Sequence, residues 1–132
     1  MAINSPISDM FVRIKNANQR KKDKVDIPSS KLKEEILKIL KDEGFISNYK
    51  VISDRKQGIL RVYMKYSPEG ERVIRDVKCI STPGRRCYRK STKINKVFRG
   101  MGISIISTPK GLMTDSKCRE LKMGGEVICS IW

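Results

Sequence analysis

The spacing of the apolar residues changes along the chain, and this change limits the available folds more than any other feature. Two stretches in the first third carry apolar residues at helical spacing. The first stripe is Ile7, Met10, Phe11 and Ile14, and the second is Leu32, Ile36, Ile39 and Leu40. Ser5 is placed to cap the first helix, Ser29 or Ser30 the second, and Gly44 follows as a stop. We expect the first helix to fade within the polar residues 16–19.

After the second helix the spacing is that of strands. Alternation predicts strands at 25–27, 45–52 and 60–66 in the first half of the chain. In the second half we expect strands at 72–80, 85–88, 103–106 and 126–132, one helical turn within 91–97, and a short helix capped by Thr114 or Asp115. The predicted class is therefore α+β. It has a helix-strand-helix-strand-strand lobe followed by a mostly antiparallel β lobe with short helices.

The segment from Ser67 to Glu71 is short, polar and rich in turn residues, which is typical of a boundary. We expect an N-terminal α/β lobe at 1–66, a linker at 67–71 and a C-terminal, mostly β lobe at 72–132. No stretch approaches the length of an apolar membrane span, and the start of the chain lacks the pattern of a secretory signal.

The positive charge is concentrated in one part of the sequence. The 132 residues carry a net charge of +15, which points to an anionic partner. Residues 77–114 hold nine basic residues and no acidic one, whereas residues 26–76 hold eleven basic and nine acidic ones. A merely soluble face would intersperse acids with the bases, so the acid-free segment favours a surface that faces an anion.

The residue types limit the possible chemistry. There is no His, which removes the commonest general base and metal ligand. The cysteines are 79, 87, 118 and 129; none forms a Cys-x-x-Cys pair, so we expect reduced, mostly buried thiols. Two disulfides are the alternative that the even number leaves open. We expect no metal, no cofactor and no small-molecule substrate.

Two similar turns follow apolar strands inside the basic segment. Each combines Ser, Thr, Pro, Gly and a cation, at 81–85 and at 107–111. Such turns offer hydroxyls, backbone N–H groups and charge to phosphates, sugars or unstacked bases. The alternative is an ordinary turn whose hydroxyls bond their own backbone. The first turn contributes five candidate contacts with nucleic acid: Thr82, Pro83, Gly84, Arg85 and Arg86.

Tyr88 lies between Arg86 and Arg89, and an aromatic ring flanked by arginines can stack on a base. A half-buried strand tyrosine is the equally open alternative. Two other classes of protein are disfavoured. A basic nucleic-acid-processing enzyme would need an acid cluster or a nucleophile–base pair in the basic half. A membrane-surface or acidic-protein binder would need an amphipathic helix with a basic face and a bulky apolar face.

Read together, several motifs resemble the bacterial form of small-subunit ribosomal protein eight, over essentially the whole chain. They are residues 81–86, Tyr88, 100–103, 107–114, 124–128, the terminal Trp132, and 8–10 with 13–17 in the opening helix. The resemblance implies a cytoplasmic, non-catalytic constituent of the small ribosomal subunit. Such a protein binds the central domain of small-subunit rRNA directly and early, helps assemble the platform, and contacts neighbouring small-subunit proteins five and twelve.

The resemblance also assigns residues. The main RNA-reading loop is implied to be Ser107, Thr108, Pro109, Lys110 and Gly111. Tyr88 is implied to lie beside this loop, and Glu126 to brace it. A second RNA surface is implied on the opening helix at Pro6, Asp9, Arg13 and Asn16. The chain departs from the family at Pro109, where many members carry Ser, and at Ile94-Asn95, where Leu-Pro is common.

Overall fold

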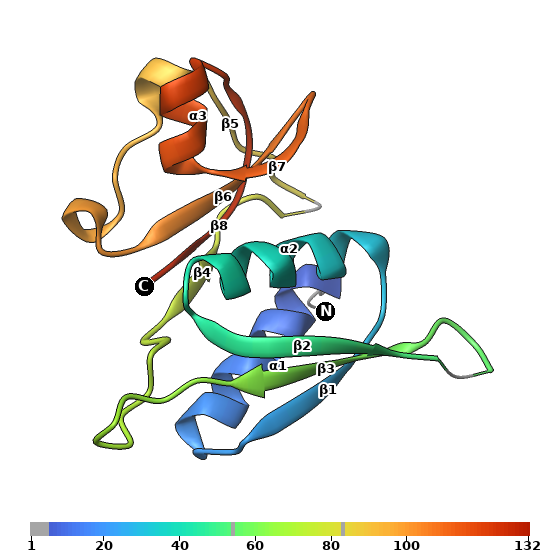
Figure 1. Ribbon diagram of the computed structural model, residues 1–132. Coiled ribbons are helices and arrows are strands. Elements are labelled where there is room, and N and C mark those ends of the chain that lie inside the picture. Colours follow the sequence, from blue (N-terminus) through green and yellow to red (C-terminus); the bar gives the residue numbers. More distant parts are fainter. Residues whose placement is uncertain (1–5, 54, 83) are drawn as a thin grey trace. The chain divides into compact units, whose positions relative to one another are not determined.

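The computed structural model describes residues 6–53, 55–82 and 84–132 (Figure 1). These residues form two compact units, one from Pro6 to Ile74 and one that includes Arg75–Trp132. Each unit has its own antiparallel sheet and at least one α-helix, which confirms the predicted α+β class. The expected cap at Ser5 lies outside the described residues.

The N-terminal unit is a three-stranded sheet with two helices. Its elements are α1 (Pro6–Gln19), β1 (Lys24–Pro28), α2 (Lys31–Asp42), β2 (Ile46–Ile52) and β3 (Ile59–Met64). The strand order is β1-β3-β2, and both pairs are antiparallel. α1 packs on β1 and β3, and α2 packs on β2. Leu60 and Val62 of the central strand are fully buried, so one face of the sheet forms the core.

The end of α1 agrees with the sequence prediction, whereas the buried side of α2 differs from it in one residue. α1 ends at Gln19, within the polar residues 16–19 where it was expected to fade, and its polar end is used internally, since the Asn18 amide donates to the carbonyl of Ile74 at 2.9 Å. In α2 the buried side includes Leu37, whereas Leu32 is exposed. Ser30 is the cap of α2, accepting from the Lys33 amide at 3.2 Å.

Residues 67–71 form a tight turn within this unit. The Ser67 amide donates to the Glu71 carbonyl at 2.7 Å, and the Gly70 amide donates to the Ser67 carbonyl at 2.8 Å. Gly70 has a φ of +82°, a backbone conformation that glycine adopts without strain. The lobe boundaries expected at 66 and 72 stay a prediction.

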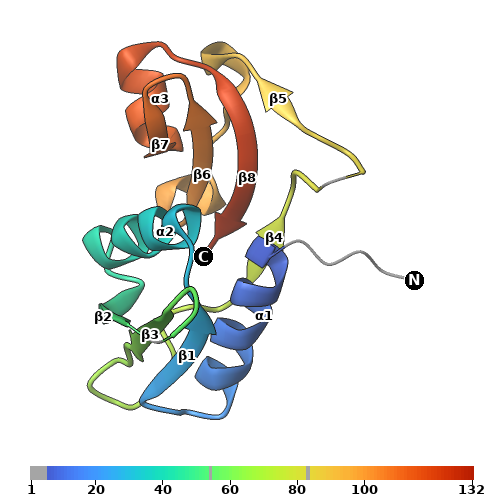
Figure 2. The same ribbon diagram turned by 90° about the vertical axis from the view of Figure 1, so that its right-hand side faces the viewer.

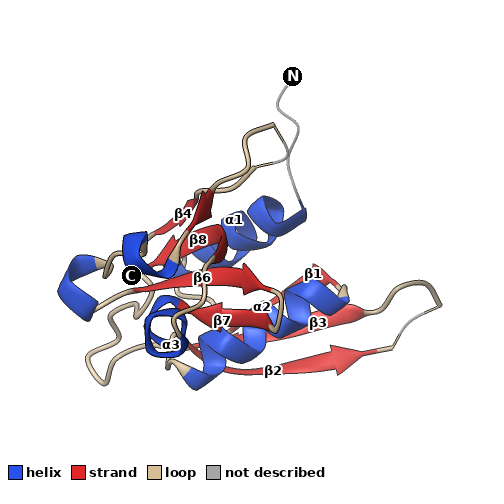
Figure 3. Ribbon diagram, turned by 90° about the horizontal axis from the view of Figure 1, so that it is seen from above, coloured by secondary structure: helices blue, strands red, loops and turns tan. Residues whose placement is uncertain are grey.

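The C-terminal unit is built around β8. Its elements are β4 (Val77–Cys79), β5 (Tyr88–Arg89), the 3₁₀ turns η1 (Ser91–Lys93) and η2 (Phe98–Gly100), β6 (Ile103–Thr108), β7 (Gly111–Thr114), α3 (Asp115–Leu121) and β8 (Gly125–Ile131). The strands run in the order β4-β8-β6-β7, and β5 also pairs with β8. In Figure 2, β8 lies between β6 on one side and β4 and β5 on the other. Figure 3 shows the β6–β7 hairpin beside α3.

Three expectations for this unit need correction. The strand expected at 72–80 is limited to Val77–Cys79, and the strand expected at 85–88 is limited to Tyr88–Arg89. No strand was expected at Gly111–Thr114, yet these four residues, which directly follow the Pro-Lys turn, form β7. The cap of α3 is Thr114, whose hydroxyl accepts from the Lys117 amide at 3.2 Å. One face of the sheet packs against Ile94 and Cys118 through Ile106 and Val127.

Candidate nucleic-acid interface

The β6–β7 turn is fixed by hydrogen bonds within the turn. Thr108 and Gly111 face each other in the ladder, so Pro109 and Lys110 form a two-residue connection. The Thr108 hydroxyl donates to the Gly111 carbonyl at 2.7 Å and accepts from the Lys110 amide at 3.2 Å. Gly111 has a φ of +110°, which favours glycine. The turn is therefore ordered, and it exposes Pro109 and Lys110 while Thr108 is buried.

Three of the predicted residues lie in one row across the sheet. Glu126 of β8 pairs with Tyr88 of β5 on one side and with Ser107 of β6 on the other. Directly paired residues point to the same face of a sheet, so these three side chains share one face. The Tyr88 side chain is 66% exposed and Ser107 is half-buried. The register thus brings Tyr88 and the 107–111 turn to one surface.

Glu126 is engaged by two side chains from the segment before β5. The Ser81 hydroxyl donates to its Oε2 atom, and Arg86 Nη1 lies 3.2 Å from the same oxygen. Ser81 in turn accepts from the Cys87 amide at 3.2 Å. The only acidic residue of the row is therefore occupied internally, and its contacts hold the 81–87 segment against β8. Ser81 was missed as a site residue, although it opens the first Ser-Thr-Pro motif.

The first turn is closed by its backbone. Thr82 and Arg85 donate to each other's carbonyls, both at 3.0 Å. Gly84, Arg85 and Arg86 are exposed, and Thr82 is half-buried. The predicted contact Pro83 lies outside the described residues. Each of the two turns is thus closed by hydrogen bonds between its first and last residues, and each carries exposed cations.

Two glycines allow the strands of this surface to approach closely. A Cβ atom on Gly125 would lie 2.1 Å from the carbonyl oxygen of Ser107, and one on Gly124 would lie 2.5 Å from that of Arg89. Neither distance is tolerated by real side chains, so any larger residue would push β6 or β5 away from β8. The Gly124-Gly125 pair therefore sets the spacing of the row that contains Tyr88 and Ser107.

The basic residues of segment 77–114 all lie at the surface. The nine exposed side chains are Lys78, Arg85, Arg86, Arg89, Lys90, Lys93, Lys96, Arg99 and Lys110. Among the residues that the structure describes, Arg86 is the only one of the nine in an ion pair, the one with Glu126. The remaining positive charge is available to an anion in solution.

The opening helix carries a separate set of predicted residues. Pro6, Asp9, Arg13 and Asn16 recur at helical spacing on one side of α1. Arg13 Nε lies 3.1 Å from Asp9 Oδ2, with both side chains about half exposed. Pro6 and Asn16 are also exposed. These four residues form a surface of the N-terminal unit.

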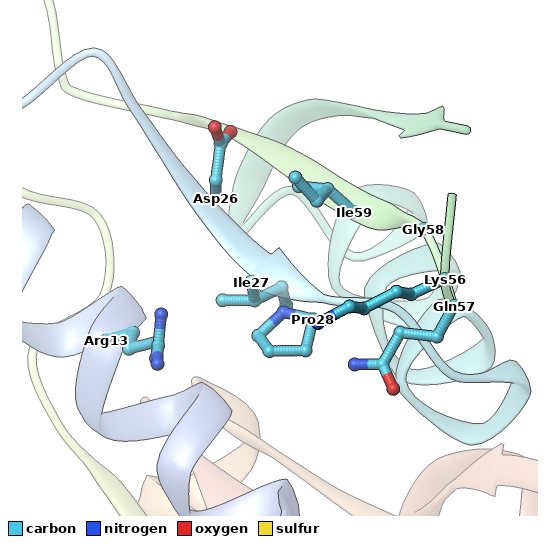
Figure 4. Close-up of a pocket in the computed structure, with 8 residues that line it drawn as sticks. All are labelled: Arg13, Asp26, Ile27, Pro28, Lys56, Gln57, Gly58 and Ile59. Atoms are coloured by element: carbon cyan, nitrogen blue, oxygen red, sulfur yellow. The ribbon is translucent and has the colours of Figure 1, made fainter. Parts of the chain in front are cut away.

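Arg13 also borders a shallow hollow of about 360 Å³ in the same unit (Figure 4). Ile27 and Pro28 line it, and Figure 4 shows Arg13 and Gln57 extending toward them from opposite sides. Asp26 at its margin is bonded by Arg61 at 2.8 and 3.1 Å, and this hydrogen bonding lowers the pKa of the Asp26 carboxyl. The positive charge of Arg61 is therefore offset, and Arg13 is the exposed cation that α1 contributes to the lining of the hollow.

Other kinds of site have no support within residues 6–53, 55–82 and 84–132. No group of three or more His, Cys, Asp or Glu side chains there is arranged to hold a metal ion. No helix in this part of the chain is both long and apolar enough to cross a membrane. All four cysteines are free thiols.

Comparison with known proteins gives one consistent result. The sequence model of the family described as Ribosomal protein S8 matches residues 5–132. A protein named small ribosomal subunit protein uS8 from Thermodesulfovibrio yellowstonii is 55% identical over 130 residues, covering 98% of this chain and 99% of the relative. Proteins of the same name from Geobacter sulfurreducens and Clostridioides difficile are 54% and 52% identical over 132 residues, covering 100% of each chain.

Proposed function

Because the chain belongs to the ribosomal protein S8 family, we propose that it binds the central domain of small-subunit rRNA directly and helps assemble the platform. Its relatives are named as proteins of the small ribosomal subunit, and the chain is a structural constituent of that particle. It is not an enzyme, and it works with small-subunit rRNA and ribosomal proteins in the cytoplasm.

One observation carries the proposal for RNA binding: Tyr88, Glu126 and Ser107 form a row that continues into the 107–111 turn, and Ser81 and Arg86 are bonded to Glu126 within it. The other eight basic residues of segment 77–114 are exposed, and none of them forms an ion pair within the described residues. An exposed ring supplies stacking, and the cations supply phosphate neutralisation. This combination suits a distorted or unstacked part of an RNA helix, whose bases are accessible.

The residues of the 107–111 turn have different roles in this proposal. Ser107 is partly exposed in the row and Lys110 is exposed at the turn tip, and we propose that the Ser107 hydroxyl and the Lys110 ammonium contact RNA directly. Thr108 already donates to Gly111 and accepts from Lys110, so one acceptor lone pair remains for a ribose hydroxyl. Thr108 therefore acts mainly by fixing the shape in which Pro109, Lys110 and Gly111 meet the RNA.

The remaining predicted residues extend this surface. Thr82, Gly84, Arg85 and Arg86 lie on the first turn, and we propose that they hold the adjacent phosphates together with Pro83. Glu126 braces the surface through Ser81 and Arg86 rather than by touching RNA. Pro6, Asp9, Arg13 and Asn16 form a second, smaller RNA contact on α1, in which Arg13 supplies the charge. The residues 1–66 and 72–132 are proposed as separate lobes, joined by 67–71.

Chemical footprinting of full-length small-subunit rRNA tests the proposal. With this protein added, we expect protected nucleotides to fall together in the central domain, and to disappear when Lys110 and Tyr88 are both replaced by Ala. Protections spread evenly over the rRNA would contradict specific binding. Crosslinking within assembled subunits tests the further proposal that proteins five and twelve are its neighbours, since crosslinks to neither would exclude that arrangement.

A further inference from the structure

Two of the four cysteines face each other across neighbouring strands. Cys79 of β4 pairs with Cys129 of β8 in the antiparallel ladder. Residues directly opposite each other point their side chains to the same face of the sheet. We propose that Cys79 and Cys129 are a modification site: a dithiol that a small-molecule disulfide oxidant closes into an internal disulfide, fastening β4 to β8.

The hydrogen-bond pattern shows that Cys79 and Cys129 form a non-hydrogen-bonded pair, the kind with the shorter Cα separation. Asp76 and Trp132 donate to each other's carbonyls, at 3.0 and 3.1 Å, and Ile80 donates to the Ile128 carbonyl at 2.9 Å. Hydrogen-bonded and non-hydrogen-bonded pairs alternate along an antiparallel ladder, so the pair at Cys79 and Cys129 is non-hydrogen-bonded. Such pairs have a Cα separation of about 4.5 Å, and disulfides span roughly 4.4–6.8 Å. A bridge therefore needs little backbone movement.

The other two thiols lie on the opposite face of the sheet. The ladder between β6 and β8 shifts register between Ile105 and Ile106: Ile105 pairs with Cys129, and Ile106 pairs with Val127. Because consecutive residues of β6 point to opposite faces of the sheet, Cys129 and Val127 lie on different faces. Cys118 packs in the core cluster with Ile106 and Val127. Cys87 precedes Tyr88, and its carbonyl accepts from the Val127 amide, which puts Cys87 opposite Val127 in the ladder. Cys79 and Cys129 are thus directly paired in the ladder and separated by the sheet from the other two thiols.

The Cys79 and Cys129 thiols differ in burial, and this difference sets the order in which they react. Burial raises the pKa of the Cys129 thiol, and the neighbouring Cys79 thiol raises it further. Cys79 is only half-buried, so it is the thiol that reaches an oxidant first. The Cys79 thiolate attacks one sulfur of glutathione disulfide and releases one glutathione thiolate. The Cys129 thiol then loses its proton as its sulfur attacks the Cys79 sulfur, and the second glutathione leaves as a thiolate that takes up a proton.

The exchange is balanced. Two protein thiols lose two electrons and two protons, and one glutathione disulfide becomes two glutathione thiols. The bridge would close a loop that contains both Ser-Thr-Pro turns, Tyr88 and Glu126. Oxidation therefore constrains the frame of the candidate RNA surface without altering any of its contact residues.

Thiol mapping of the full-length folded protein tests the proposal. The reduced protein is incubated with glutathione disulfide at mildly alkaline pH, remaining thiols are alkylated, and peptides are identified by mass. We expect a monomer that has lost two hydrogens, a Cys79–Cys129 linkage, alkylated Cys87 and Cys118, and a higher thermal unfolding midpoint.

Two variants with matched exposure provide the controls. Cys79 and Cys87 are both half-buried. Cys87→Ser should leave the linkage and the upward shift of the midpoint intact, and Cys79→Ser should abolish both. A glutathione adduct that stays on Cys79 without internal linkage would overturn the proposal, as would a linkage that involves Cys87 or a second protein molecule.

Discussion

The hydroxyl of Thr108 donates to the carbonyl of Gly111 at 2.7 Å, while the amide of Lys110 donates to the same hydroxyl at 3.2 Å. The buried Thr108 side chain thus bonds one residue of the exposed tip and the residue that ends the turn. The turn therefore presents Pro109 and Lys110 in one conformation before any RNA arrives. Pre-formed contacts of this kind lower the ordering cost of binding.

Thr108→Ala should reduce the difference in affinity between the specific RNA and an unrelated RNA. The change removes both bonds of the hydroxyl, at a cost of about 1 kcal/mol per bond in stability. Thr108→Ser keeps the hydroxyl and should keep most of the discrimination. Filter binding with both RNAs measures this, and an unchanged preference in Thr108→Ala would mean that the loop is only a turn.

Lys110→Ala should weaken binding to both RNAs and make binding less sensitive to salt. Lys110 is exposed at the tip of the turn, so its ammonium meets a phosphate rather than a base. Losing one phosphate contact lowers the slope of log affinity against log salt by about 1. Lys38→Ala, which removes an exposed cation on α2, serves as the matched control. Equal slopes for wild type and Lys110→Ala would exclude this contact.

Substitutions at Tyr88 should separate the contribution of the ring to RNA binding from that of the hydroxyl. The side chain is 66% exposed, so its ring is available for stacking. Tyr88→Phe should bind RNA nearly as well as wild type, and Tyr88→Ala should lose about 1–3 kcal/mol of binding free energy. Calorimetric titration of the two variants gives the comparison. If Tyr88→Phe loses as much as Tyr88→Ala, the hydroxyl and not the ring makes the contact.

Gly125→Ala should destabilise the C-terminal unit and disturb the binding surface. Its new methyl group would lie 2.1 Å from the Ser107 carbonyl oxygen, and such overpacking costs about 1–3 kcal/mol. Gly84→Ala is the control, because a Cβ there meets nothing within 4 Å. Chemical denaturation should show a lower free energy of unfolding for Gly125→Ala alone, and equal stability of the two variants would contradict the close packing.

The sequence predicted the elements better than it predicted their contacts. Helical spacing identified α1 and α2, and Ser30 and Gly44 were correctly placed at the ends of α2. The end of α1 was predicted, but the bond from the Asn18 amide was not, because its partner, the Ile74 carbonyl, is distant in sequence. The core contains Leu37 and not the predicted Leu32. Burial depends on which side of α2 meets the sheet, and a single apolar stripe does not decide that.

The candidate surface was predictable in composition but not in arrangement. The two Ser-Thr-Pro motifs, Tyr88 and the acid-free charge are visible in the sequence. The row of Tyr88, Glu126 and Ser107 depends on strand register, which local patterns do not supply. The bond from Ser81 to Glu126 joins residues 45 positions apart, and the Cys79–Cys129 pair depends on the same kind of long-range register.

The most direct measurement is a binding titration at several salt concentrations. The protein is titrated against a central-domain fragment of small-subunit rRNA and against an unrelated RNA of equal length. We predict tighter binding to the fragment at every salt concentration, with both affinities falling as salt rises, because base and shape contacts add to phosphate contacts for one RNA only. Equal affinity for the two RNAs at all salt concentrations would contradict specific recognition.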